Sequence, residues 1–137
     1  DLGAADPALH YRIALCLEQQ GQIAEAIAAY RDALESRPGW IPATNNLAWI
    51  LATDAELGNS QQAVQLARTA VAATRRQDPK TLDTLAVALA ADGDYPAAIA
   101  TAEEALRLAK VNQMSELADE ISLRLKEYHA GRAIIEK

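Results

Sequence analysis

The residues that could carry chemistry are few and widely separated. Cys16 is the single cysteine of the 137-residue chain, and its two histidines are His10 and His129, near opposite ends. A metal site needs several such ligands converging, and a nucleophile needs a base within reach. Neither arrangement can be assembled from these residues. We therefore predict no catalytic residue, no metal site and no cofactor, and we expect Cys16 to pack as a small hydrophobe inside a helical bundle.

The charged residues also indicate helix surfaces rather than a reactive site. Acidic pairs such as Glu103-Glu104 are adjacent in sequence, so their side chains diverge on a helix and are expected to be solvated. Arg75-Arg76 is the one basic doublet. We expect it to close a helix C-terminus, where the helix dipole favours cations. Contact with an anion is the alternative interpretation of this doublet.

Composition favours closely packed helices and excludes two classes of partner. Half of the residues are hydrophobic but only 4% are aromatic, and alanine, a strong helix former, dominates. A net charge of −6 argues against nucleic-acid binding. No apolar run approaches the roughly 18–20 residues of a membrane span. The sequence opens on Asp1 with no signal peptide, so we expect an excised fragment or a processed product, and no compartment can be assigned.

The segment 7–38 predicts two short amphipathic helices. Asp6-Pro7 is a helix start, because Asp caps exposed N–H groups and Pro needs no partner at the first position. The first helix should end near Gln20, since Gly21 accepts the left-handed conformation found after a helix. A second helix is expected from Ile23 to Ser36, stopped by the Pro-Gly that follows.

Spacing within this segment repeats along the chain. The positions that recur are small or apolar, and in the first copy they are Leu17, Gly21, Ala26, Tyr30, Ala33 and Pro38. This pattern resembles the tetratricopeptide repeat family over about residues 7–110. The resemblance implies one domain, 1–137: an all-α, right-handed α-solenoid of seven helices. Its parts would be repeats 7–40, 41–78 and 79–112, a capping helix 113–130 and a tail 131–137.

Two parts of the chain depart from the repeat. The second copy carries three extra residues within 52–59, which either lengthen a helix or bulge the loop. Its second helix is expected to run about one turn further, through Arg76. After the third copy, Ser115 is the predicted N-cap of a capping helix that ends at Ala130-Gly131. Its apolar stripe consists of Met114, Leu117, Ala118, Ile121, Leu125 and Tyr128. The N-terminal end lacks such a cap, so we expect further repeats or another domain to precede residue 1.

The resemblance implies a protein–protein interaction module. In this family the first helix of each hairpin lines a concave groove that takes a peptide or helix of a partner. The corresponding positions here are Tyr11, Leu15, Glu18, Asn45, Trp49, Thr53, Lys80, Asp83 and Val87. Trp49 could be a binding anchor or could simply pack in the core. Trp40 is expected to fill the joint between repeats, and Asn46 to bond the backbone there.

Other functions follow from the same residues. Family members that clamp a chaperone C-terminus use five Lys, Asn and Arg positions, of which Asn46 and Lys80 alone match, so that function is not expected. The asparagine ladder of O-GlcNAc-transferase-like repeats is also unsupported. Two further hypotheses are self-association, through the uncapped N-terminal edge and the apolar tail Ala133–Ile135, and a docking or regulatory role attached to a larger enzyme. The identity of a partner cannot be predicted.

Overall fold

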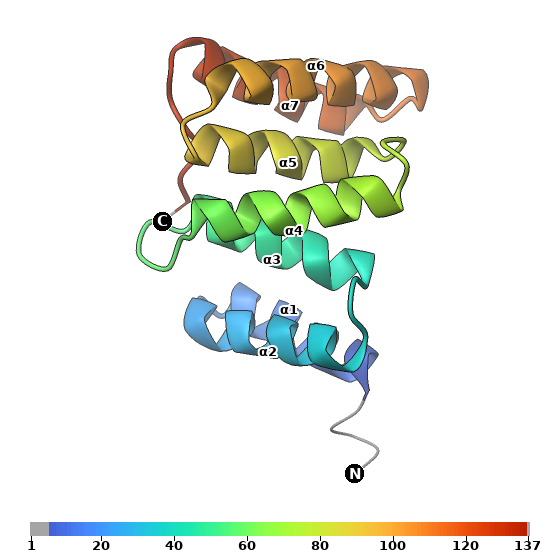
Figure 1. Ribbon diagram of the computed structural model, residues 1–137, viewed down its shortest axis with the longest axis vertical. Coiled ribbons are helices and arrows are strands. Elements are labelled where there is room, and N and C mark those ends of the chain that lie inside the picture. Colours follow the sequence, from blue (N-terminus) through green and yellow to red (C-terminus); the bar gives the residue numbers. More distant parts are fainter. Residues whose placement is uncertain (1–5, 137) are drawn as a thin grey trace.

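The computed structural model describes residues 6–136 and shows a stack of helical hairpins (Figure 1). This confirms the predicted all-α solenoid. In Figure 1, α2 lies in front of α1, α4 in front of α3, and α6 in front of α7. The helices are α1 (Pro7–Gln19), α2 (Ile23–Ser36), α3 (Ile41–Thr53), α4 (Ser60–Ala73), α5 (Pro79–Ala91), α6 (Tyr95–Val111) and α7 (Ser115–His129).

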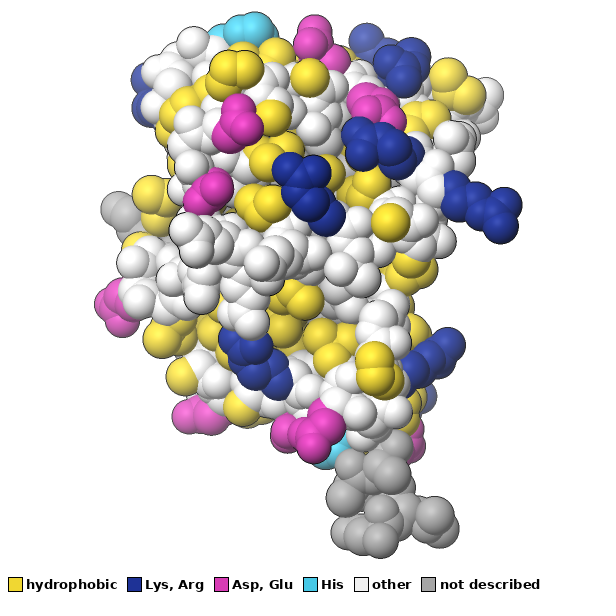
Figure 2. All heavy atoms as spheres, in the orientation of Figure 1, with side chains coloured by type: hydrophobic (Ala, Val, Ile, Leu, Met, Phe, Trp, Pro, Cys, Tyr) yellow, Lys and Arg dark blue, Asp and Glu magenta, His cyan; other side chains and the backbone are white. Residues whose placement is uncertain are grey.

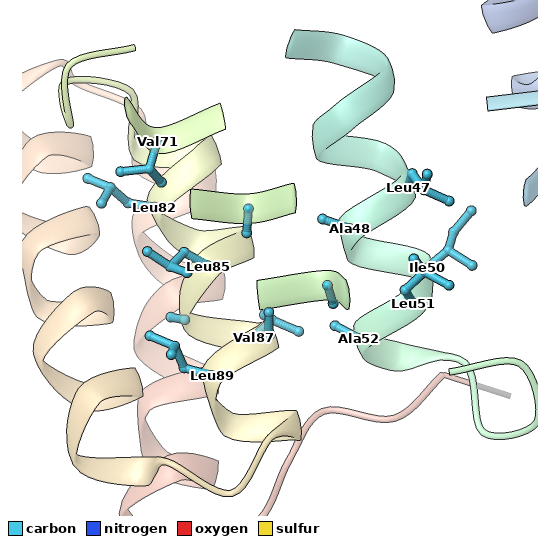
Figure 3. Close-up of a cluster of buried hydrophobic side chains, with 14 of the residues drawn as sticks. Leu47, Ala48, Ile50, Leu51, Ala52, Val71, Leu82, Leu85, Val87 and Leu89 are labelled. Carbon is cyan, nitrogen blue, oxygen red and sulfur yellow. The ribbon is translucent and has the colours of Figure 1, made fainter. Parts of the chain in front are cut away.

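The core is centred on α5, where every residue from Thr81 to Ala90 is buried. Alanines make up much of the helix contacts, and their small side chains let neighbouring helices approach closely. In Figure 3, Leu82 and Leu85 point to the side of α5 turned away from α3, whereas Val87 points toward α3 and Ala52. The middle of the stack is therefore packed on both sides of α5.

Helix starts and stops follow the predicted chemistry in the first hairpin. Asp6 Oδ1 accepts hydrogen bonds from the N–H groups of Ala8 and Leu9, at 3.0 and 3.3 Å. Gly21 has φ +78°, the left-handed conformation that ends a helix at low cost for glycine. The bounds of α2 are those expected from the sequence.

The second hairpin is irregular in its loop and not in its helices. Six residues, 54–59, connect α3 to α4, against three, 20–22, in the first hairpin. Asp54 Oδ1 accepts the N–H groups of Glu56 and Leu57, which orders this loop. A Cβ at Gly58 would lie 2.6 Å from the carbonyl oxygen of Asp54, so the loop closes tightly on the end of α3. Of the two expected outcomes of the insertion, the bulged loop is the observed one.

The expected extra turn of α4 is wrong, because α4 ends at Ala73 and has 14 residues, like α2. Arg75 and Arg76 have φ of 55° and 56°, outside the right-handed helical region. In this conformation the backbone N–H groups of Arg75 and Arg76 donate to the carbonyl oxygens of Ala72 and Val71, at 3.1 and 3.0 Å, which ends the helix. The Thr74 hydroxyl lies 3.1 Å from that of Thr81. These bonds satisfy the last carbonyls of α4 and tie its end to α5.

The capping helix α7 has the predicted apolar stripe but a different start. Ala118, Ile121 and Tyr128 are buried and Leu125 is half-buried. The residue at the N-cap position is Met114, which makes no side-chain cap bond, so the expected Ser115 cap is wrong. Ser115 is instead the first residue of the helix.

Cys16 is exposed, which corrects the expectation that it is packed. It lies on α1 near Leu9 and Ile13, whose side chains are 43% and 42% exposed. These residues are about one helical turn apart, so they form one apolar stripe. Within residues 6–136 no helix covers this stripe, because the stack ends there.

The tail after α7 folds back along the stack instead of extending from it. In Figure 1 it runs from α7 past the end of α5 to the loop between α3 and α4. The backbone N–H of Glu136 donates to the carbonyl oxygen of Thr53 at 2.8 Å. Ile134 packs against the core, while Ile135 is 63% exposed. Part of the apolar tail is thus already packed against its own chain, and part remains exposed.

The face formed by α2, α4 and α6 is polar. In Figure 2, charged side chains of both signs are scattered at the level of α6, and few charged side chains show at the level of α4. Hydrophobic side chains show mainly between the helices.

Candidate functional site

Large aromatic side chains fill the joint between the first two hairpins. The Tyr11 ring centroid lies 5.3 Å from that of Trp40 and 6.0 Å from that of Tyr30, both at tilted angles that aromatic pairs favour. The guanidinium of Arg37 stands 5.2 Å from the Trp40 ring centroid on the outer side. Trp40 therefore occupies the joint, as predicted.

A hydrogen-bonded chain crosses the same joint. Tyr30 donates its hydroxyl to Glu18 Oε1 at 2.7 Å. Asn46 Nδ2 donates to the hydroxyls of Tyr30 and Tyr11, at 3.2 and 3.3 Å. Burial, with a smaller contribution from Glu18, raises the pKa of Tyr30, so this hydroxyl remains a donor. Asn46 bonds across the joint between repeats, as expected, but it bonds the hydroxyls of Tyr11 and Tyr30 in the first hairpin and not the backbone.

These large side chains leave α1 and α3 apart, whereas the backbones of α3 and α5 approach closely. The result is a hollow of about 270 Å³ between α1 and α3. It is lined by Leu15, Glu18, Gln19, Asn46 and Trp49. A neighbouring hollow of about 460 Å³ shares Asn46 and Trp49 and continues past Asn45 and Lys80. We call the two together the concave groove.

An ion pair closes the far side of the concave groove. Arg124 of α7 donates to both carboxylate oxygens of Asp83, at 2.6 and 3.0 Å. Burial raises the pKa of Asp83, and the two hydrogen bonds from Arg124 oppose that rise. The same guanidinium lies 5.2 Å from the Trp49 ring centroid, within the range of a cation–π contact. The position of Trp49 is thereby tied to α7.

Trp49 also contacts the folded-back tail. Its indole Nε1–H donates to Glu136 Oε1 at 3.1 Å. The Trp49 side chain is half-buried and borders both hollows. It is therefore neither a core residue alone nor a free surface residue, and its polar edge faces the concave groove.

The predicted groove residues fall into two groups. Six of them line the concave groove: Leu15, Glu18, Asn45, Trp49, Lys80 and Asp83. Of these, Asp83 is only 4% exposed and is paired with Arg124. The other three are withdrawn from the groove: Tyr11 lies in the aromatic joint, and Thr53 and Val87 are 2% and 0% exposed.

The withdrawn residues have a common cause, which is the closeness of the neighbouring helices. Val87 faces α3 and not the open side (Figure 3). Thr53 turns its hydroxyl onto the carbonyl oxygen of Trp49, at 2.7 Å, and has no exposed surface to offer. The concave groove is consequently bordered by α1 and α3 in its first hollow and by α3, α5, α7 and the tail in its second.

Sequence reasoning missed Arg124 and Glu136. Arg124 had a detectable signal: it stands among the apolar positions of α7, and Asp83 is an acid within the hydrophobic run of α5. Two opposite charges inside apolar stripes predict a buried pair, since an unpaired buried charge is costly. Glu136 had no such signal, because it follows the glycine that ends α7.

Two further observations bear on chemistry and location. Within residues 6–136, no group of three or more His, Cys, Asp or Glu side chains is placed to hold a metal ion. None of the helices in that range is long and apolar enough to cross a membrane.

The architecture defines the class: stacked helical hairpins with a capping helix and a concave groove, an α-solenoid. Residues 7–40 match the family model described as Tetratricopeptide repeat. The first hairpin is thus similar to a tetratricopeptide repeat, and the hairpins stacked on it are consistent with an all-α solenoid of such repeats. No curated protein matches the chain. Tetratricopeptide repeats are non-enzymatic modules that generally mediate protein–protein interactions.

Proposed function

We propose that this domain binds a peptide or helix of a partner protein in the concave groove. The observation that carries the proposal is Trp49. It offers a large half-buried ring and an indole N–H to the groove, and Arg124 holds that ring in place. Tryptophan in such a setting is the residue type most often found at binding hot spots.

The rest of the concave groove suits the same role. Leu15 supplies apolar surface next to Trp49, while Glu18, Gln19 and Lys80 place polar groups around it. Hollows of this kind accept segments of peptide, with the apolar floor giving affinity and the polar rim giving orientation.

Binding to a random peptide library displayed on phage tests the proposal. Peptides selected on the intact domain should bind Trp49→Ala at least tenfold more weakly, which corresponds to a loss of about 1.4 kcal/mol. Circular dichroism should show that the variant remains helical. Because Trp49 also packs on Arg124, Gln19→Arg serves as a second variant: Gln19 is exposed and lines the groove, so its substitution leaves the core intact.

Leu123→Ser provides the matched control, since Leu123 is 63% exposed on α7. Its affinity for the selected peptides should equal that of the unmodified domain. If Trp49→Ala and Gln19→Arg both stay folded and bind as tightly as the control, the concave groove is not the binding site.

Self-association is a second candidate, supported by the apolar stripe on α1. Leu9 and Ile13 expose over 40% of their surface there, where the stack ends. Two copies could bury these stripes against each other. Light scattering over a concentration series, with Leu9→Ser/Ile13→Ser as comparison, tests this: a monomer at millimolar concentration rules it out.

A further inference from the structure

The folded-back tail makes three contacts of different kinds at one end of the concave groove. Its backbone pairs with α3, because the N–H of Glu136 donates to the carbonyl oxygen of Thr53 and the two segments form a parallel bridge at Asp54. Glu136 Oε1 accepts the Trp49 indole N–H at 3.1 Å. Ile134 packs against the hydrophobic core.

Each of these contacts requires a particular chemistry from whatever segment lies there. An indole N–H is a donor only, so the group facing Trp49 must be an acceptor. The carbonyl oxygen of Thr53 needs a backbone N–H, which excludes proline at that position. The surface under Ile134 takes an apolar side chain, while Ile135, between the two, points to solvent. Over the three consecutive residues 134–136, the contacts therefore require an apolar side chain, then one that is exposed to solvent, then an acidic one.

The loop insertion of the second hairpin builds the place where the tail pairs. Asp54 leaves α3 in an extended conformation, with φ −74° and ψ 125°, and its carboxylate holds the turn that follows. An extended backbone at the end of a helix can pair with a passing strand-like segment. A cleft of about 710 Å³ lies on the other side of Glu136, between this loop and the turn of the first hairpin.

We propose that residues 133–136 act as an internal ligand of the concave groove. The partner that replaces them is an extended peptide with an aliphatic side chain two positions before a carboxylate. This inference rests on the proposed function, because it names the partner chemistry of the same groove. The partner's carboxylate takes the place of Glu136 at Trp49, and its backbone takes the bond to Thr53.

The tail is suited to be displaced. One backbone bond, one side-chain bond and one half-buried isoleucine hold its end, and both Glu136 and Ile135 are exposed. Its start is fixed separately: Arg132 donates its backbone N–H and its Nε to the carbonyl oxygen and carboxylate of Glu127, at 2.9 and 2.6 Å. The residues after Arg132 can therefore leave the groove while the tail remains tethered beside it.

The test uses a variant of the 137-residue chain, Ile134→Ser/Glu136→Ala, whose own tail has lost two contacts. The ligand is an acetylated peptide with the sequence of residues 131–137. Titration is followed by the NMR signals of the two indole N–H groups. The peptide should shift the Trp49 signal and leave that of Trp40 in place, since Trp40 lies in the aromatic joint. The unmodified chain should bind the peptide at least fivefold more weakly, because its tethered tail competes at an effective concentration of about millimolar.

Peptide variants check the chemistry of each contact. Ile134→Ser and Glu136→Leu in the peptide should abolish the shift of the Trp49 signal. Ile135→Ser is the matched control and should bind like the parent peptide, because Ile135 is exposed. The inference is overturned if the variant chain gives no Trp49 shift at millimolar peptide, if both chains bind equally, or if Ile135→Ser loses as much as Ile134→Ser.

Failure of this inference is distinguishable from failure of the proposed function. One possible result is that library peptides selected on the variant chain lose affinity when Trp49 is replaced, but lack the aliphatic and acidic pair. In that case they would also bind at the same time as the tail peptide, without competing with it. That result overturns the internal-ligand inference and leaves groove binding standing. If no selected peptide depends on Trp49 or Gln19, the groove itself is not a binding site and both proposals fall.

Discussion

The joint between α1 and α3 and the joint between α3 and α5 are built on the same repeat frame but differ in side-chain size. Tyr11, Trp40 and Asn46 occupy the first joint and keep the two helices apart. Ala52 and Val87 face each other in the second, where the helices pack closely. Side-chain volume at a few positions, and not the repeat itself, thus decides where the solenoid is open.

This difference separates stability from binding. The closed joint continues into α5, which is buried throughout its middle, and into α7, which is held by the Arg124–Asp83 pair. The open joint exposes the groove and is joined mainly by aromatic contacts and a chain of hydrogen bonds. In a stack whose repeats contact only their neighbours, local stability follows these interfaces. We expect the C-terminal half to be the stable part and the first hairpin to open more readily.

The largest loss of stability is expected from a substitution of Asp83, in the closed half of the stack, by which we mean α3 to α7. Asp83→Ala removes the partner of Arg124, whose side chain is only 16% exposed. Loss of one member of a buried pair typically costs about 3–5 kcal/mol. We expect the lower end of that range, because Glu120 remains 3.6 Å from the guanidinium. Urea denaturation followed by circular dichroism measures the loss.

A double variant supplies the control for that prediction. Asp83→Leu/Arg124→Met removes both charges together and should regain most of the stability, since no buried charge is left unpaired. If the double variant is as unstable as Asp83→Ala, packing and not charge pairing is what Asp83 contributes, and the contrast between the joints rests on the alanines alone.

A medium effect is expected in the open joint at Asn46. Asn46→Ala removes two hydrogen bonds, to Tyr11 and Tyr30, and should cost about 1–2 kcal/mol. Amide hydrogen exchange should quicken in α1 and α2 but not in α5 and α6, because the bonds lost connect the first hairpin to the second.

Thr84 is the matched control for Asn46, because it holds the equivalent position one repeat later. Its hydroxyl bonds the carbonyl oxygen of Lys80 within the same helix, at 3.1 Å, so Thr84→Ala removes no bond between hairpins. Exchange in α1 and α2 should be unchanged in this variant. Equal quickening of exchange in all helices of Asn46→Ala would show that the two joints are not independent.

Much of this fold could be predicted because each helix of the repeat is determined by interactions between residues close together in the sequence. Asp-Pro starts, glycine stops and apolar periodicity each determine a helix within a few residues, and α2 was predicted to the residue. The six predicted residues that do line the concave groove were found by their position in the repeat. The predicted extra turn of α4 was wrong because two arginines in the left-handed conformation end the helix, where no glycine marks the end in the sequence.

The remainder depends on contacts between residues far apart in the chain. Whether Val87 faces a groove or a neighbour depends on how closely α3 approaches α5, and that spacing is set by alanines on another helix. Cys16 was expected to be packed because of its residue type, yet its exposure depends on what lies beside α1. Glu136 in the tail and Thr53 are more than 80 residues apart in the sequence, and no local pattern predicts a contact between them.

The smallest effect belongs to the surface of the closed half, at Arg76 and Glu104. Arg76, in the turn before α5, donates to both carboxylate oxygens of Glu104 on α6, at 2.7 and 3.1 Å. The Arg76 side chain is 49% exposed, so solvent screens the pair and Glu104→Gln should cost less than about 1 kcal/mol at neutral pH. Hydrogen bonds from Arg76 hold the pKa of Glu104 below its ordinary value.

A lowered pKa in the folded state fixes the sign of the pH dependence. The stabilisation is complete above the ordinary glutamate pKa of about 4.3 and is lost as the pH falls through the lower folded value. The difference in unfolding free energy between the unmodified chain and Glu104→Gln should therefore shrink toward zero in acid and with added salt. Exposed Glu103 on the same helix supplies the control, and Glu103→Gln should show a smaller difference at neutral pH. A Glu104→Gln difference that persists in acid would mean that the side chain acts through packing, and that this surface pair does not help to fasten the closed half.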